Sequence, residues 1–171
     1  MDLLLLAKPG VHLYSVLHNS ETAWQAIRFY EHVNLGYGVL FSVSGCVSAL
    51  ALASDIRYYI RRYVAYHLFR TEQNKQIYAT PTLVFSRYLE HTDPFNDAWD
   101  HRLILTITES VEYPFICTRV ETVDNRKKEL EFSIQAEYEI LSTQKEWEEI
   151  VIFNLPARQT KVDDREVKTP S

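Results

Sequence analysis

The pattern of apolar and polar positions changes near residue 80, and this change divides the chain. Before it, apolar residues recur at intervals of three or four, which is typical of helices that bury one face. After it, apolar and polar residues alternate, which is typical of half-buried strands. The sequence therefore predicts an α+β protein, with N-terminal helices followed by an antiparallel β-domain over residues 80–156.

The clearest strand is predicted at residues 129–141, where six apolar residues alternate with glutamate, serine and glutamine. A polar turn at 124–128 precedes this strand and predicts a hairpin with a strand at 115–123. The other predicted strands of this five-stranded antiparallel domain lie at 82–89, 102–108 and 144–155. One face of the sheet is acidic, so its apolar face needs a cover, which a helix at 21–33 or 55–75 could supply.

Residues 35–53 form a run of 19 residues without a charged side chain. A helix of that length extends about 28 Å, close to the roughly 30 Å of a bilayer's hydrocarbon core. Tyrosines flank both ends, as in an aromatic belt. These features favour a single transmembrane helix, with residues 1–34 forming a helical segment at the interface. The alternative is a central buried helix of a soluble fold, because an all-round apolar helix is buried in either solvent.

Small residues within this run recur at an interval of four. Such spacing lets another backbone approach closely, so it predicts a partner helix in lipid or tight core packing in a soluble fold. The residues of this helix-packing stripe are Gly38, Ser42, Gly45, Ala49 and Ala53.

Residues 54–76 are predicted to continue as a basic, tyrosine-rich amphipathic helix. Arginine pairs with phosphate and tyrosine straddles a membrane interface, so this helix suits the headgroup layer. The positive-inside rule places its end, and the β-domain, in the cytoplasm or the mitochondrial matrix. The residues expected to contact anionic lipid such as cardiolipin, or a partner protein, are Arg57, Arg61, Arg62, Arg70 and Lys75. A solvated basic face packed on the β-domain explains the same pattern without lipid.

Composition narrows the possible partners. The 171 residues carry a formal net charge of −5, so nucleic acid is not expected to bind. The two cysteines lie in the apolar run and in a predicted strand, which supports neither a disulfide framework nor a zinc site. Asp2 stands where a secretory signal needs positive charge. The polar tail at 157–171 is expected to be extended or disordered unless a partner orders it.

The segment 91–101 contains three aspartates and two histidines, which could bind a divalent metal or supply acid–base groups. The order of these residues matches neither a calcium loop nor a zinc-binding helix, and a capped helical turn between strands explains them as well. The candidate metal ligands are Asp93, Asp97, Asp100 and His101. With four glycines and no nucleophile elbow, the chain is expected to hold no cofactor and to have no catalytic residue.

The leading hypothesis is a non-catalytic, single-pass accessory subunit of a membrane protein complex, with the mitochondrial inner membrane as its expected location. The first alternative is a soluble α+β domain whose helices pack on a curved sheet and which binds a small apolar ligand or acts as an enzyme. In that case the 91–101 segment would supply polar groups at the mouth of a pocket. The second alternative is a peripheral module that binds anionic lipid through its arginines.

Overall fold

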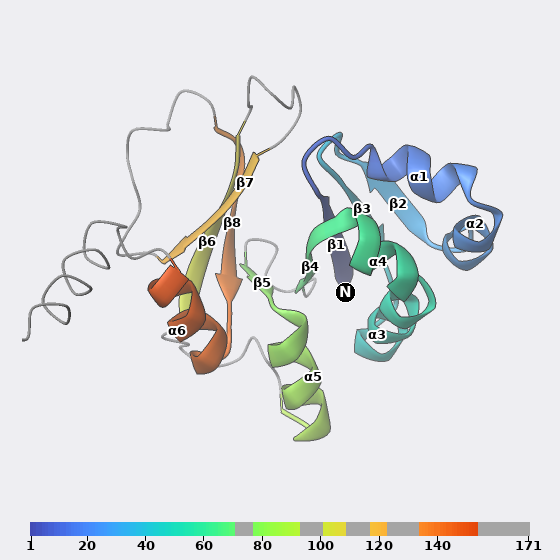
Figure 1. The fold of residues 1–171 in the computed structure, drawn as a ribbon. Coiled ribbons are helices and arrows are strands. Elements are labelled where there is room, and N and C mark those ends of the chain that lie inside the picture. Colours follow the sequence, from blue (N-terminus) through green and yellow to red (C-terminus); the bar gives the residue numbers. More distant parts are fainter. Residues whose placement is uncertain (71–76, 93–100, 109–116, 123–133, 154–171) are drawn as a thin grey trace, which may run out of the picture.

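The computed structural model describes residues 1–70, 77–92, 101–108, 117–122 and 134–153. Within these ranges the strands form one eight-stranded mixed sheet, in the order β2-β3-β1-β4-β5-β8-β6-β7 (Figure 1). In chain order the elements are β1 (Asp2–Ala7), α1 (Leu13–Asn19), α2 (Glu21–Ile27), β2 (Glu31–Asn34), β3 (Gly38–Ser42), α3 (Cys46–Asp55), α4 (Arg57–Tyr63), β4 (Val64–Arg70), β5 (Ile77–Ala79), α5 (Pro81–Leu89), β6 (Arg102–Thr108), β7 (Cys117–Thr122), β8 (Ile134–Leu141) and α6 (Gln144–Phe153).

The first half of the sheet, β1 to β4, is built around β1. This strand pairs antiparallel with β3 on one side and β4 on the other, and its four consecutive leucines are fully buried. Leu3 and Leu5 face the core beneath α1 to α4, whereas Leu4 and Leu6 face the opposite side. A strand with both faces covered needs apolar residues at every position, which explains the uninterrupted leucines.

The second half of the sheet, β6 to β8, faces the first half across a shared core. Leu103, Leu105 and Ile107 of β6 belong to the same buried cluster as Leu4 and Leu6 of β1. The sheet must therefore curve, so that the inner faces of its two halves meet in this inner core. Figure 1 shows the two halves of the sheet facing each other. No separate helix is needed to cover this apolar face of the second half.

The two halves are joined through the short strand β5. It pairs with β4 through a single antiparallel residue pair, Phe69 with Ala79, and runs parallel to β8 over three pairs. The other pairings are antiparallel, so β5 is what makes the sheet mixed.

The predicted transmembrane helix at 35–53 is wrong, because the run contains a strand and a separate helix. β3 occupies its first part and α3 its second, and Gly45 stands at the N-cap of α3. The uncharged character comes from a strand buried between its neighbours and from a helix that packs on the sheet. In the part of the chain that the structure describes, no helix is long and apolar enough to cross a membrane.

The predicted helix over 54–76 is also wrong. The described residues there form the end of α3, the short helix α4 and then β4. The predicted helical segment 1–34 contains two strands, β1 and β2, as well as α1 and α2. The helix start at Ser20 is confirmed, since its side chain accepts a hydrogen bond from the Ala23 amide at 3.4 Å.

The five-stranded antiparallel domain is wrong in two of its strands. The strand at 102–108 is confirmed, and β7 and β8 lie inside the strands predicted at 115–123 and 129–141. The predicted hairpin between these two strands is wrong, because β6 lies between β7 and β8 and pairs with both. The segments 82–89 and 144–155 contain helices instead, α5 and α6. Each helix begins at a threonine cap, Thr80 and Thr143, and the side chains of these caps stabilise helical first turns.

Candidate functional site

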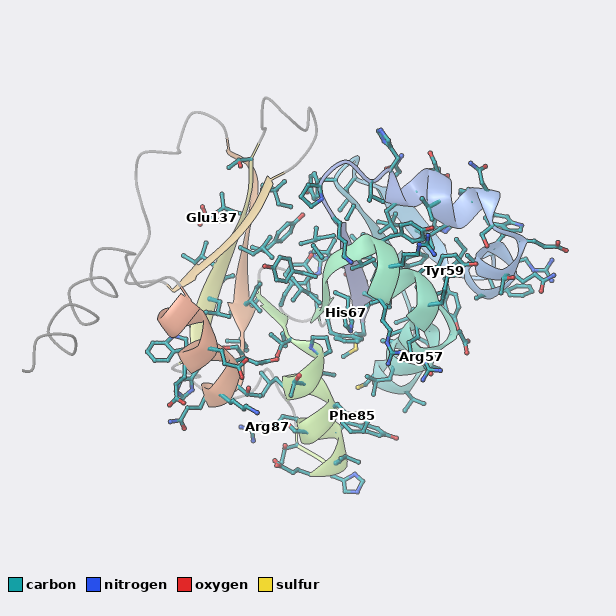
Figure 2. All side chains as sticks on the ribbon, in the orientation of Figure 1. Arg57, Tyr59, His67, Phe85, Arg87 and Glu137 are labelled. Atoms are coloured by element: carbon teal, nitrogen blue, oxygen red, sulfur yellow. The ribbon has the colours of Figure 1, made fainter. Side chains whose placement is uncertain are left out.

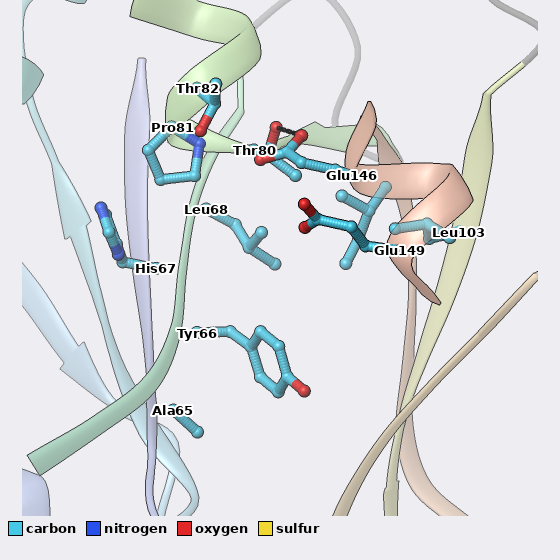
Figure 3. Close-up of a pocket in the computed structure, with 11 residues that line it drawn as sticks. Ala65, Tyr66, His67, Leu68, Thr80, Pro81, Thr82, Leu103, Glu146 and Glu149 are labelled. Carbon is cyan, nitrogen blue, oxygen red and sulfur yellow. Dashed lines mark hydrogen bonds between the residues drawn. The ribbon is translucent and has the colours of Figure 1, made fainter. Parts of the chain in front are cut away.

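A pocket of about 530 Å³ opens where the parallel strands β5 and β8 end and the helices α5 and α6 begin (Figure 3). Ligands of sheets with parallel strands commonly bind beyond the carboxyl ends of those strands. The residues that line the pocket are Ala65, Tyr66, His67, Leu68, Thr80, Pro81, Thr82, Leu103, Ile140, Glu146 and Glu149. They come from five separate elements and from the cap of α5.

One wall of the pocket is the edge of β4. Four consecutive residues of this strand, Ala65 to Leu68, line the pocket, although neighbouring side chains of a strand point to opposite faces. Figure 3 shows this alternation, with Tyr66 and Leu68 on one side of the strand and His67 on the other. The edge is open here because β5 pairs with β4 only at Phe69, before β4 is fully covered.

The opposite wall is held by a junction between the first turns of α5 and α6. The Thr80 hydroxyl caps α5 by accepting from the Leu83 amide at 3.3 Å, and it donates to Oε2 of Glu146 at 2.7 Å. Thr143 donates to the same oxygen through its amide at 2.9 Å and its hydroxyl at 3.2 Å. Thr143 and Glu146 thus form a capping box that is also bonded to the neighbouring helix.

The polar side of the pocket is acidic. Oε2 of Glu146 accepts three hydrogen bonds, which fixes this carboxylate in position. The carboxylate of Glu149, one helical turn later, also lines the pocket and has no hydrogen-bond or ion-pair partner among the described residues. Ala65, Leu68 and Leu103 provide an apolar floor beside these two carboxylates.

Two titratable groups of β4 are neutral at pH 7. Burial lowers the pKa of His67, because an enclosed imidazolium loses its hydration. Burial raises the pKa of Tyr66 for the same reason, since the phenolate is the charged form. With neither residue charged, the two glutamates dominate the electrostatics of the pocket.

Behind the pocket, tyrosines and an ion pair stiffen the inner core. The hydroxyls of Tyr37 and Tyr138 are 2.6 Å apart, and the ring of Tyr138 meets that of Tyr78 edge-on. Burial, together with the bond to Tyr37, raises the pKa of Tyr138. Arg70 donates to Asp2 from Nε at 3.0 Å and from an Nη at 2.5 Å, and its guanidinium lies 5.1 Å from the Tyr78 ring centre. These contacts tie β1 and β4 to β5 and β8.

The predicted helix-packing stripe does not lie on one helix. Gly38 and Ser42 belong to β3, Gly45 precedes α3, and Ala49 and Ala53 lie within α3. Gly38 does allow a close backbone approach, because a Cβ built there would stand 2.2 Å from the carbonyl oxygen of Leu5 on β1. Gly38 therefore allows β3 to lie close to β1 and does not contribute to helix packing.

The predicted basic residues separate into two groups. Arg57, Arg61 and Arg62 all lie exposed on α4. Arg70 turns to the inner core, where it is paired with Asp2. Lys75 falls outside the described residues.

Of the predicted metal ligands, Asp93, Asp97 and Asp100 also fall outside the described residues. The ring of His101 packs edge-on against Trp147, and its carbonyl accepts hydrogen bonds from the amide and hydroxyl of Ser142 at 3.0 and 3.2 Å. The described part of the chain contains no group of three histidine, cysteine, aspartate or glutamate residues arranged to hold a metal.

The site residues that the sequence analysis missed come mainly from the two helix starts. The sequence signal for Glu146 was present, since Thr143-Gln-Lys-Glu146 has the spacing of a capping box. Thr80-Pro81 likewise has a cap followed by a proline suited to the first helical position. No local signal marks Tyr66 or Leu68 as pocket residues, because their role depends on where β5 ends.

Fold and site together define an α+β protein with a curved mixed sheet and a pocket at the joint between its two halves. Comparisons of the chain with protein-family models, with curated proteins and with solved structures found no match.

Proposed function

We propose that the protein binds a small molecule with an apolar body and a positively charged end in the pocket between β4, α5 and α6. The observation that carries this proposal is an apolar pocket whose polar side holds two carboxylates, one of them without a partner among the described residues. Its volume of about 530 Å³ falls within the usual range for small-molecule sites.

The two glutamates have different roles in this proposal. Glu146 is held by Thr80 and Thr143, so it fixes the negative potential of the wall and joins α5 to α6. Glu149 is exposed and can turn toward a ligand to form a charge-assisted hydrogen bond. The apolar body of the ligand would lie against Leu68, Leu103 and Ile140.

The test uses three probes with one ring system and different charges: 2-naphthylmethylammonium, 2-naphthylmethanol and 2-naphthoate. Each is titrated into the full-length protein by calorimetry. We expect the ammonium probe to bind most tightly and the carboxylate probe least tightly, because the pocket carries two negative charges. A preference for the carboxylate probe would contradict the proposal.

Two variants of α5 test whether the probes bind in this pocket. In Thr82→Trp the new ring occupies the mouth of the pocket, so all probes should lose affinity by about tenfold or more. Phe85→Trp is the matched control, because Phe85 is exposed on the same helix and does not line the pocket (Figure 2). Equal losses in both variants would show that the probes bind elsewhere.

A Glu149→Gln variant tests the charge preference. It should weaken binding of the ammonium probe by about tenfold, the loss of one charge-assisted hydrogen bond, and leave the neutral alcohol unchanged. Glu148→Gln is the control, since Glu148 neighbours Glu149 and bonds Gln144 instead.

A further inference from the structure

A second hollow lies at the junction of α3 and α4, and it shares no lining residue with the pocket. Its volume is about 480 Å³, and it is lined by Ser54, Asp55, Arg57, Tyr58, Arg61 and Arg62. None of the residues of α4 is buried, although the helix packs between α3 and β4. Figure 2 shows Arg57 on this helix, away from the second half of the sheet.

The charge of this hollow is opposite to that of the chain. Three arginines and one aspartate give it a net charge of +2 (3 − 1), whereas the whole chain carries −5. Lys8 approaches the same helix, where its ammonium donates to the carbonyl of Arg61 at 3.1 Å. A positive hollow on an acidic protein attracts anions locally while the rest of the surface repels them.

The guanidinium groups of Arg57 and Arg61 are uncompensated. Among the described residues neither has a hydrogen-bond or ion-pair partner, although Asp55 stands at the same hollow. Arg62 is oriented differently, because its Nη1 donates to the Tyr58 hydroxyl at 2.9 Å and its guanidinium lies 5.6 Å from the Tyr63 ring centre. Two arginines one helical turn apart therefore keep their full donor capacity beside a third whose side chain is held in place.

We propose that this hollow binds a phosphate group through Arg57 and Arg61, with Arg62 and Tyr58 forming its side. Guanidinium groups match the oxygens of a phosphate with paired hydrogen bonds, and charge-assisted bonds of this kind are about twice as strong as neutral ones. The phosphate can belong to a free anion or to a lipid headgroup, because both offer the same oxygens.

The variants remove charge without touching the core. Arg57→Gln combined with Arg61→Gln changes two exposed side chains of α4. The matched control is Arg28→Gln combined with Lys145→Gln, two exposed positions outside the hollow that give the same change in net charge. Circular dichroism and thermal unfolding are used to check that each variant remains folded.

The experiment has two arms, pyrophosphate titrated by calorimetry and co-sedimentation with phosphatidylcholine vesicles that contain or lack phosphatidylglycerol. We expect pyrophosphate to bind the native protein and the control equally, and to bind the Arg57/Arg61 double variant at least about tenfold more weakly. Sedimentation with phosphatidylglycerol vesicles that pyrophosphate reverses assigns the phosphate to a lipid. Pyrophosphate binding without vesicle association assigns it to a free ligand. Failure of the native protein to bind either probe, or an equal loss in the control variant, overturns the proposal.

Discussion

The two halves of the sheet differ in how many of their faces are buried. β1, in the first half, has helices on one face and the second half of the sheet on the other, and its leucines are fully buried. β6 and β8 bury their inner face, whereas their outer face combines the buried Ile104 with the charged residues Arg102, Glu137 and Glu139. Figure 2 shows Glu137 on this half of the molecule. Both halves of the sheet therefore contribute residues to the inner core. The second core, beneath α1 to α4, is built mainly by the first half.

The largest expected effect comes from filling the closest backbone contact of the first half. In Gly38→Ala the new methyl group would stand 2.2 Å from the Leu5 carbonyl oxygen, so β3 must move away from β1. We expect a loss of about 3 kcal/mol or more in the free energy of unfolding, measured with urea. Gly45→Ala is the control, because its backbone is extended and nothing lies within 4 Å of the added atom, so its effect should stay within about 0.5 kcal/mol. Similar stabilities would contradict the close β1–β3 approach.

Truncation of the inner core tests whether the two halves share it. Leu4→Ala in β1 and Leu105→Ala in β6 each remove a fully buried side chain of the same cluster, and each should lower the free energy of unfolding by about 3 kcal/mol. Because the core is shared, both variants should unfold in one transition, followed by tryptophan fluorescence and circular dichroism. If Leu105→Ala unfolded in two steps while Leu4→Ala did not, the halves would be independent.

The two ion pairs provide a smaller contrast between the halves. The Asp2 and Arg70 side chains are 14% and 17% exposed, whereas those of Glu139 and Arg102 are 37% and 40% exposed. We expect Asp2→Asn to cost about 2 kcal/mol, because Arg70 is left in the inner core without its carboxylate. Glu139→Gln should cost about 0.5 kcal/mol or less, as for other exposed pairs. Urea denaturation measures both, and equal costs would mean that the depth of the pair does not matter here.

The smallest expected effect concerns pH and His67. Burial lowers the pKa of this imidazole below its ordinary value of 6.5, so the unfolded chain takes up a proton before the folded one does. The contribution of His67 to stability is therefore complete above pH 6.5 and declines as the pH falls toward the folded pKa. The melting temperature of the native protein, minus that of His67→Gln, should decrease between pH 7.5 and pH 5. A difference that stays constant with pH would contradict the lowered pKa of the half-buried His67 imidazole.

The same contrast between the halves explains which strands could be predicted from the sequence. β8 turns Ala136, Tyr138 and Ile140 to the inner core and glutamates to the other face, so its alternation could be detected in the sequence. β1 buries both faces, and Leu3 to Leu6 give no alternation to detect. The uncharged run at 35–53 resembles a membrane helix because a buried strand and an apolar helix adjoin in the chain.

The helices of the site were within reach of sequence reasoning, but the pocket was not. Thr80-Pro81 and Thr143-Gln-Lys-Glu146 are both starting signals of helices, although the change to alternating apolar residues after residue 80 predicts strands. The pocket depends on Ala65 to Leu68 lying opposite Glu146 and Glu149, some eighty residues later. That placement depends on the pairing of β5 with β4 and with β8, which neither periodicity nor composition reveals.

The first half of the sheet is formed by one continuous stretch of the chain, which affects how the protein folds during its synthesis. Residues 1–70 contain β1 to β4 and α1 to α4, so this half can assemble as soon as it leaves the ribosome. Its inner face, with Leu4, Leu6 and Leu68, stays uncovered until β6 has been synthesised, and β6 begins only at Arg102. During that interval the nascent chain displays an apolar sheet surface, a natural target for a chaperone. Translation pauses within this interval should therefore increase aggregation more than pauses after β8 has emerged.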